Sequence, residues 1–116
     1  MDWQTAYNKA QLLLQSLEKN SKELMERLED ENKASINYDS IRAQQTSAYD
    51  KKGISKTALK EIVSGDKLVM ESKQALDKAS LDVKKSEIKI KYIDHALSIE
   101  KRALNYYEGV ARNFRE

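Results

Sequence analysis

Lysine and arginine are the residues of this chain whose spacing points most clearly to chemistry. Four lysines surround the glycine of "YDKKGISKT" at 49–57, namely Lys51, Lys52, Lys56 and Lys60. A turn that brings exposed backbone N–H groups and cationic side chains together can hold a phosphate or another anion. The turn is therefore the first candidate binding site for an anionic partner.

A second set of cations follows the C-terminal half at intervals of eleven, seven and eleven residues: Lys73, Lys84, Lys91 and Arg102. At about 100° per residue, these side chains stay within roughly 20° of one another on a helix. Beside them, Tyr92 and Tyr106 offer rings on which nucleic-acid bases can stack while the cations follow the phosphates. Two interpretations stay open, because such lysines can also solubilise an apolar stripe or pair with acids at a subunit interface.

Groups that could support catalysis or bind a metal are sparse. The chain has one histidine, His95, and no cysteine, so no pair of nucleophile and general base can be proposed. Di-metal helical bundles need a glutamate three residues before the histidine, and Tyr92 stands there instead. The sequence also lacks a glycine-rich phosphate loop. We therefore predict that the protein is not an enzyme and uses no cofactor and no metal.

A heptad repeat predicts the element that positions these cations. One seam position recurs every seven residues at Ile62, Val69, Leu76, Val83, Ile90, Leu97, Leu104 and Ala111. Three residues later, the second seam position begins with small residues: Gly65, Ser72, Ala79 and Ser86. Small residues there let another helix approach closely. Residues 66–114 would form a helix about 70 Å long at ~1.5 Å per residue.

The stretch "KKSEIKIKYIDHAL" at 84–97 alternates apolar and polar residues as a strand does. A helix explains the alternation as two stripes, with Ile90 on the seam and a second apolar stripe on the opposite face. Such a helix must be covered twice, once by its own chain and once by another molecule. We expect oligomerisation through Leu81, Ile88, Tyr92, Leu97, Ile99, Leu104, Tyr106 and Tyr107.

The N-terminal arm has a less regular apolar face, made by Trp3, Tyr7, Ala10, Leu14, Leu17, Leu24 and Leu28. After the charged run "ERLEDENK" the face resumes in a shifted phase with Ala34, Tyr38, Ile41 and Ala48. A phase shift of this kind predicts a stutter or a local bend.

Turn chemistry is confined to two places. Gly53 is free to take a left-handed conformation, and Ser55 can cap the helix that follows it. In "VSGD" at 63–66, Gly65 either ends a short helix, with Asp66 capping a new one, or lies on the seam of a continuous helix. Glu100 falls on the seam, where a carboxylate is costly unless paired, so we expect an Arg or Lys partner from another helix.

The whole chain, 1–116, is predicted to be one all-α domain. Its fold is an elongated helical hairpin or coiled-coil-like bundle that oligomerises, with a first arm at 2–48, a basic turn at 49–56, a short helix at 57–64 and a long C-terminal helix at 66–114. The composition agrees, since the chain is 34% charged and holds no Pro and 3 Gly.

Charge and polarity restrict the class of partner. Residues 1–50 hold six Lys/Arg against nine Asp/Glu, whereas residues 51–116 hold fifteen against ten. An anionic partner is therefore expected on the second half. The first 19 residues are too polar and too short for a signal peptide or a membrane span. With no cysteine, the sequence favours a cytoplasmic protein without a membrane partner.

The order of these parts resembles the phage recombination mediator family of UvsY. The likeness is best over residues 55–116, where "SKTALKEIVSGDKLVMESKQAL" runs into a long helix ending "KRALNYYEGVARNF". The resemblance implies a ring of subunits that binds single-stranded DNA and loads a RecA-like recombinase onto DNA covered by single-strand-binding protein. It also implies a basic-x-basic tripeptide before the turn, matched by Arg42-Ala43-Gln44. Gln44 replaces the second cation, which moves that role to Lys51 and Lys52.

Two functions follow as hypotheses. The first is a homo-oligomeric, single-stranded-DNA-binding recombination mediator that contacts DNA through Arg42, Lys51, Lys52, Lys56, Lys60, Lys84 and Lys91. The alternative is a non-enzymatic helical scaffold or adaptor, such as a virion or secretion-associated protein, whose apolar stripes bind a protein partner.

Overall fold

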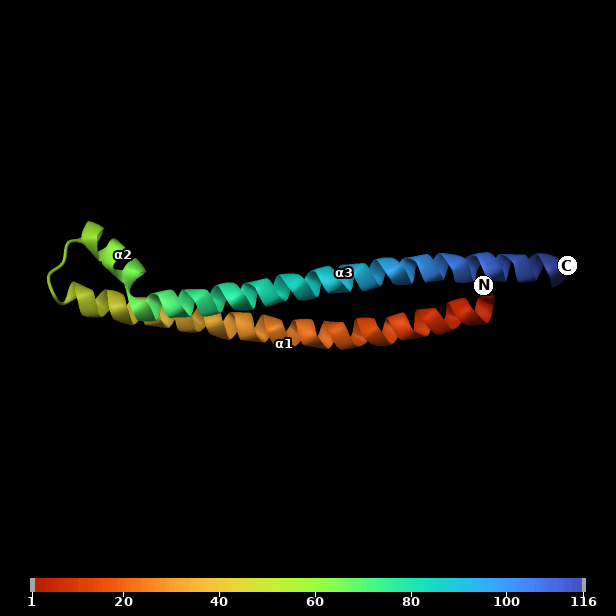
Figure 1. The fold of residues 1–116 in the computed structure, drawn as a ribbon, viewed down its shortest axis with the longest axis horizontal. Helices are drawn as coiled ribbons and strands as arrows, with labels where there is room; N and C mark the ends of the chain where they lie inside the picture. Colours follow the sequence, from red (N-terminus) through yellow and green to blue (C-terminus); the bar gives the residue numbers. More distant parts are fainter. Residues whose placement is uncertain (1, 116) are drawn as a thin grey trace. The chain divides into compact units, whose positions relative to one another are not determined.

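The computed structural model describes residues 2–115 of the chain, and the side chains of residues 2–112. These residues form three α-helices and no strand: α1 (Trp3–Asp50), α2 (Lys56–Gly65) and α3 (Lys67–Arg115) (Figure 1). The predicted all-α fold class is confirmed. The alternating stretch at 84–97 lies entirely within α3, so its pattern is that of a helix with two apolar stripes.

The chain divides into two compact units. The terminal unit contains residues 1–25 and 85–116, and the turn unit contains residues 26–84. Within each unit a segment of α1 pairs with an antiparallel segment of α3, and the turn unit also contains α2 (Figure 1).

The heptad seam of α3 is confirmed by burial from Val69 to Leu97, whereas Ala111 at its predicted end is exposed. Every buried described side chain of this helix lies on the predicted seam: Val69, Ser72 and Val83 in the turn unit, and Ser86, Ile93 and Leu97 in the terminal unit. Burial of these side chains against α1 supplies the main favourable free energy of the pairing. Small serines among them keep the two helix backbones close.

The seam of α1 is unbroken, so the predicted stutter is wrong. Covered positions alternate by three and four residues along the helix: Ala6, Ala10, Leu13, Leu17, Asn20, Leu24, Arg27, Glu31, Ala34, Tyr38, Ile41 and Gln45. Four of these positions hold polar side chains. A pattern made from apolar residues alone therefore does not include them. Leu14 and Leu28, which suggested the other phase, lie on the flank and are each 43% exposed.

Two polar seam residues of α1 donate hydrogen bonds to backbone carbonyls. Asn20 is buried and its Nδ2 donates to the Ser16 carbonyl oxygen at 2.7 Å. In the turn unit, Arg27 Nη1 donates to the Asp82 carbonyl oxygen of α3 at 3.1 Å. Because the Arg27 bond joins α1 to α3, it requires one alignment of the two helices and so favours a single helix register.

The turn between α1 and α2 has the predicted chemistry. Gly53 adopts the left-handed conformation with φ of 76°, and its N–H donates to the Asp50 carbonyl oxygen at 3.0 Å. Ser55 is the N-cap of α2, where its Oγ accepts from the backbone N–H of Ala58. Both assignments for this turn are therefore confirmed.

The chain breaks at Asp66, which decides between the two alternatives for "VSGD". Gly65 ends α2, and Asp66 is extended with ψ of 134°. Its Oδ1 accepts from the backbone N–H groups of Leu68 at 2.9 Å and Val69 at 3.2 Å, so Asp66 caps α3. The seam of α3 therefore starts after this break. The buried residue of α2 is Val63.

Candidate nucleic-acid interface

A hollow in the turn unit gathers three of the predicted cationic residues. The hollow measures about 410 Å³ and is lined by Arg42, Thr46, Asp50, Lys56, Leu59, Lys60 and Val63. We call it the basic groove. Three cations against one carboxylate make its rim positive, which favours an anionic ligand.

Helical spacing explains why these side chains meet. Arg42, Thr46 and Asp50 are four residues apart on α1, so they form one row along that helix. On α2, Lys56 and Lys60 form a second row, and Leu59 and Val63 form the apolar row beside it. The groove is thus a cationic rim over an apolar base.

Asp66 fixes α2 in place by joining α1 to α3. Its Oδ2 accepts from Tyr49 Oη at 2.8 Å and from Gln45 Nε2 at 3.0 Å, while its Oδ1 caps α3. We call this group the Asp66 clamp. The hydrogen bond from Tyr49 lowers the pKa of Asp66, with further lowering by Gln45 and the backbone N–H groups. The same hydrogen bond raises the pKa of Tyr49.

The turn extends the cationic surface beyond the groove. Lys51 and Lys52 are both exposed. The Lys52 ammonium lies 5.2 Å from the centroid of the Tyr49 ring, a cation–π contact that connects the turn to the Asp66 clamp. Gln44 is exposed and does not line the groove, whereas Arg42 of the same tripeptide does.

The remaining predicted DNA contacts lie elsewhere on α3. Lys84 is exposed in the turn unit and does not line the groove, and Lys91 is exposed in the terminal unit. Their neighbour in the pattern, Lys73, pairs with Asp77 at 3.1 Å and lies 5.7 Å from the Tyr38 ring centroid. Lys73 therefore pairs with an acid of its own helix, a role different from both interpretations given above for these cations.

The second apolar stripe of α3 is exposed. Its members are at least half accessible: Leu81, Ile88, Tyr92, Ile99 and Tyr106, with Tyr92 at 77%. We call them the outer stripe. The other residues expected to oligomerise differ from them, since Leu97 is 3% exposed and is covered by its own chain, and Leu104 and Tyr107 are half-buried.

Glu100 lies half-buried on the seam of the terminal unit, as predicted. Its Oε2 atom is buried and has no hydrogen-bond partner among the described residues. The heptad located this carboxylate correctly, and its pairing with an Arg or Lys from another helix stays a prediction.

Other kinds of site find no support in the described part of the chain. No three His, Cys, Asp or Glu side chains among residues 2–115 come together as a metal site would require. His95 is exposed. No helix in this range is long and apolar enough to cross a membrane.

Sequence reasoning found the cations of the groove but missed the residues that place them. Gln45 and Tyr49 gave no signal as clamp residues, because their role depends on how α1 and α3 are aligned. The spacing of Arg42, Thr46 and Asp50 could have predicted that these residues share one face of α1 just before the turn.

Comparison with known proteins identifies no relative whose function could be considered for this chain. No protein-family model matches it, and neither the curated proteins nor the solved structures contain a match. The resemblance to the UvsY family therefore rests on the sequence features quoted above.

Proposed function

We propose that the protein is a cytoplasmic recombination mediator that binds single-stranded DNA through the basic groove. In this role it helps to load a RecA-like recombinase onto DNA covered by single-strand-binding protein. The observation that carries the proposal is that Arg42, Lys56 and Lys60 line one hollow at the turn. The loading activity rests on the resemblance to the UvsY family.

The make-up of the groove favours a single strand over a duplex. Its cations can pair with phosphates, while Leu59 and Val63 offer an apolar surface beside them. Unpaired bases have exposed faces that can pack on such a surface, whereas paired bases keep these faces inside the stack. Lys51 and Lys52 extend the cationic path along the turn.

Homo-oligomerisation belongs to the proposal and is supported by the outer stripe. Five large apolar side chains on one helix face remain at least half exposed, a surface typical of protein contacts. A second copy covering this stripe would remove it from water. Light scattering should report an oligomer for the wild type and a smaller mass for Ile88→Asp or Tyr92→Asp, and a monomeric wild type would contradict this part.

The binding step is tested with fluorescent oligonucleotides between 50 and 300 mM salt. Each neutralised phosphate of a single strand contributes about −0.7 to the slope of log affinity against log salt. Three groove cations therefore predict a slope of about −2 for a single strand, with weaker binding of the matching duplex. Absence of binding at 50 mM salt would refute the proposal.

The loading step needs its own assay. A RecA-like recombinase hydrolyses ATP only after it has displaced single-strand-binding protein from the strand, so the lag before hydrolysis measures loading. We expect the protein to shorten that lag and the variant with both Lys56→Glu and Lys60→Glu to leave it unchanged. An unchanged lag with the wild type would restrict the function to DNA binding.

The second candidate function is the scaffold or adaptor, which the exposed outer stripe also favours. The two candidates differ in what the basic residues do. Charge reversal of Arg42, Lys51 and Lys52 should abolish DNA binding and spare oligomerisation in a mediator. In a scaffold the same change should alter neither the oligomer nor the binding of its protein partner.

A further inference from the structure

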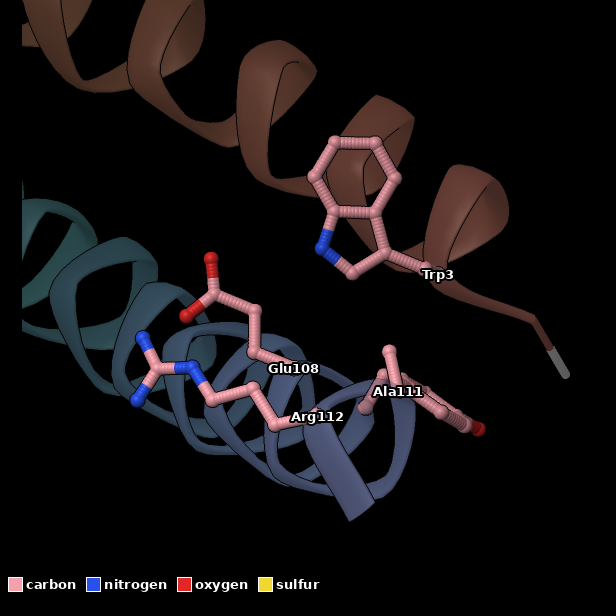
Figure 2. A pocket seen from close by; sticks show the side chains of 5 residues that line it. Trp3, Glu108, Ala111 and Arg112 are labelled. Carbon is pink, nitrogen blue, oxygen red and sulfur yellow. The ribbon is translucent and has the colours of Figure 1, made fainter. Parts of the chain in front are cut away.

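A second hollow lies in the terminal unit and has a different chemistry from the basic groove. It measures about 410 Å³ and is lined by Trp3, Tyr107, Glu108, Ala111 and Arg112 (Figure 2). Trp3 comes from the first turn of α1 and the other four come from the last turns of α3. We call it the terminal hollow. Its volume falls in the range of roughly 300–1,000 Å³ that is usual for small-ligand pockets.

Trp3 presents a supported aromatic surface to this hollow. Its ring stacks on Tyr7 with centroids 5.0 Å apart and planes 14° apart, and Tyr7 is not part of the lining. One face of the indole is thereby held by a neighbouring ring, and Trp3 remains 41% exposed. A second ring, Tyr107, is contacted by Tyr106 at 5.5 Å in an edge arrangement. A planar ligand can stack here without any rearrangement of the indole.

The two charged residues of the hollow are available to a ligand. Glu108 and Arg112 are one helical turn apart, and their side chains extend to the same side of the hollow, below the Trp3 ring (Figure 2). Within the described residues, neither side chain takes part in a hydrogen bond or an ion pair. An aromatic face, one cation and one carboxylate acceptor therefore surround the same space.

We infer that the terminal hollow binds one unpaired base of a single strand, and this inference rests on the proposed DNA-binding function. The base stacks on the Trp3 indole, and the guanidinium of Arg112 pairs with the adjacent phosphate. The Glu108 carboxylate repels phosphate, so it is directed to the edge of the base, where it accepts N–H bonds. A purely apolar ligand would leave both charges without partners, and inorganic phosphate alone would not use the indole.

The carboxylate also predicts which base is preferred. Guanine presents two adjacent donors, the N1–H and the N2 amino group, and both can reach the two oxygens of one carboxylate. Thymine presents a single N–H flanked by two carbonyl oxygens, which a carboxylate repels. A guanine in an otherwise thymine strand should therefore bind several-fold more tightly than thymine at the same place.

Trp3 is the only tryptophan of the chain, so its fluorescence reports on this hollow alone. We would titrate the wild type with a thymine 15-mer and with the same strand carrying one central guanine. The expected result is quenching of Trp3 by both strands, at several-fold lower concentration for the guanine strand. Equal quenching curves for the two strands would overturn the assignment of Glu108 to the base edge.

Matched variants separate the site from a general effect of charge. Arg112→Gln should weaken the quenching several-fold, whereas Lys101→Gln, at an exposed cation on the same helix and in the same unit, should leave it nearly unchanged. Glu108→Gln should abolish the preference for guanine, and the exposed Glu87→Gln should keep it. Equal effects of Arg112→Gln and Lys101→Gln would overturn the site.

Fluorescence anisotropy of a labelled strand, measured in parallel, distinguishes this inference from the proposed function. Strand binding without any change of Trp3 fluorescence overturns the terminal hollow and leaves the basic groove standing. Quenching that persists unweakened in the variant with Lys56→Glu and Lys60→Glu supports the hollow and contradicts the groove. Absence of binding by both methods overturns both. By anisotropy, Trp3→Leu should weaken binding about 5- to 150-fold, the range for loss of one stacked base.

Discussion

The turn unit and the terminal unit are built from segments of the same two long helices. They differ in how a carboxylate in each unit is hydrogen-bonded. In the turn unit, Asp66 accepts hydrogen bonds from two backbone N–H groups and from Tyr49 and Gln45. In the terminal unit, the buried Oε2 of Glu100 accepts none from the described residues. A satisfied carboxylate fixes a geometry, whereas an unsatisfied one weakens the packing around it.

The two candidate sites also differ in how directional the contacts around them are. The basic groove lies beside a junction held by directional hydrogen bonds, and its chemistry is cationic. The terminal hollow is lined by rings and by one pair of opposite charges, and its helices are held by apolar seam residues such as Leu97. We infer that the turn unit is the more rigid of the two and that the terminal unit opens more readily.

The largest effect is expected from Leu97→Ala in the terminal unit. Leu97 is 3% exposed, and removing a buried leucine side chain costs about 2–5 kcal/mol. Hydrogen exchange should then show that amides of the terminal unit lose protection before those of the turn unit, which keeps the Asp66 clamp.

Ile99→Ala is the matched control, since Ile99 lies close by on the outer stripe and is 51% exposed. At a dilution where the chain is monomeric, its cost should stay within about 0.5 kcal/mol. Simultaneous loss of protection in both units of the Leu97→Ala variant would contradict the difference in rigidity.

A smaller effect is expected from Tyr49→Phe in the turn unit. The lowered pKa of Asp66 means that its hydrogen bonds stabilise the fold above about pH 4 and lose this effect as the pH falls through the folded-state pKa. The raised pKa of Tyr49 means that its bond stabilises the fold below about pH 10 and loses this effect as the pH rises through the folded-state value.

Melting temperatures from circular dichroism between pH 3 and pH 11 measure this dependence. The wild type should melt a few degrees above Tyr49→Phe near neutral pH, and the difference should shrink toward both ends of the range. A difference that stays constant across the whole range would show that the clamp does not depend on these two ionisations.

The smallest effects are expected at two glycines, one in each unit, and with opposite signs. Gly53 has φ of 76°, so Gly53→Ala should destabilise the turn unit by about 1 kcal/mol. Gly109 lies inside α3 with nothing within 4 Å of an added Cβ, so Gly109→Ala should stabilise by about 0.5–1 kcal/mol. Denaturant midpoints give both values, and a shift of the same sign at both positions would be inconsistent with these two backbone geometries.

How much the sequence revealed depends on whether a residue acts through its own helix or through helix pairing. The seam of α3 was predictable because Val69, Val83 and Leu97 are apolar at a fixed spacing. The seam of α1 was not, because Arg27 and Gln45 hold seam positions with polar side chains whose bonds leave the helix and form only in the folded chain.

The candidate sites follow the same rule. Lys56 and Lys60 were predicted from the turn alone, whereas their approach to Arg42 depends on the angle that the Asp66 clamp gives to α2. The terminal hollow could not be predicted, since Trp3 and Arg112 are brought together only by the register between α1 and α3. The chemistry of a single segment can therefore be predicted from the sequence. A site that two helices form together can be identified only from the structure.

The most direct test of the central claim compares two variants with the same change of net charge. One carries Lys56→Glu and Lys60→Glu in the groove, and the other carries Lys33→Glu and Lys78→Glu at exposed positions of the same unit. At 50 mM salt, single-strand affinity should fall about 100-fold for the groove variant and less than about 5-fold for the control. Equal losses in the two variants would contradict the claim that the groove is the binding site.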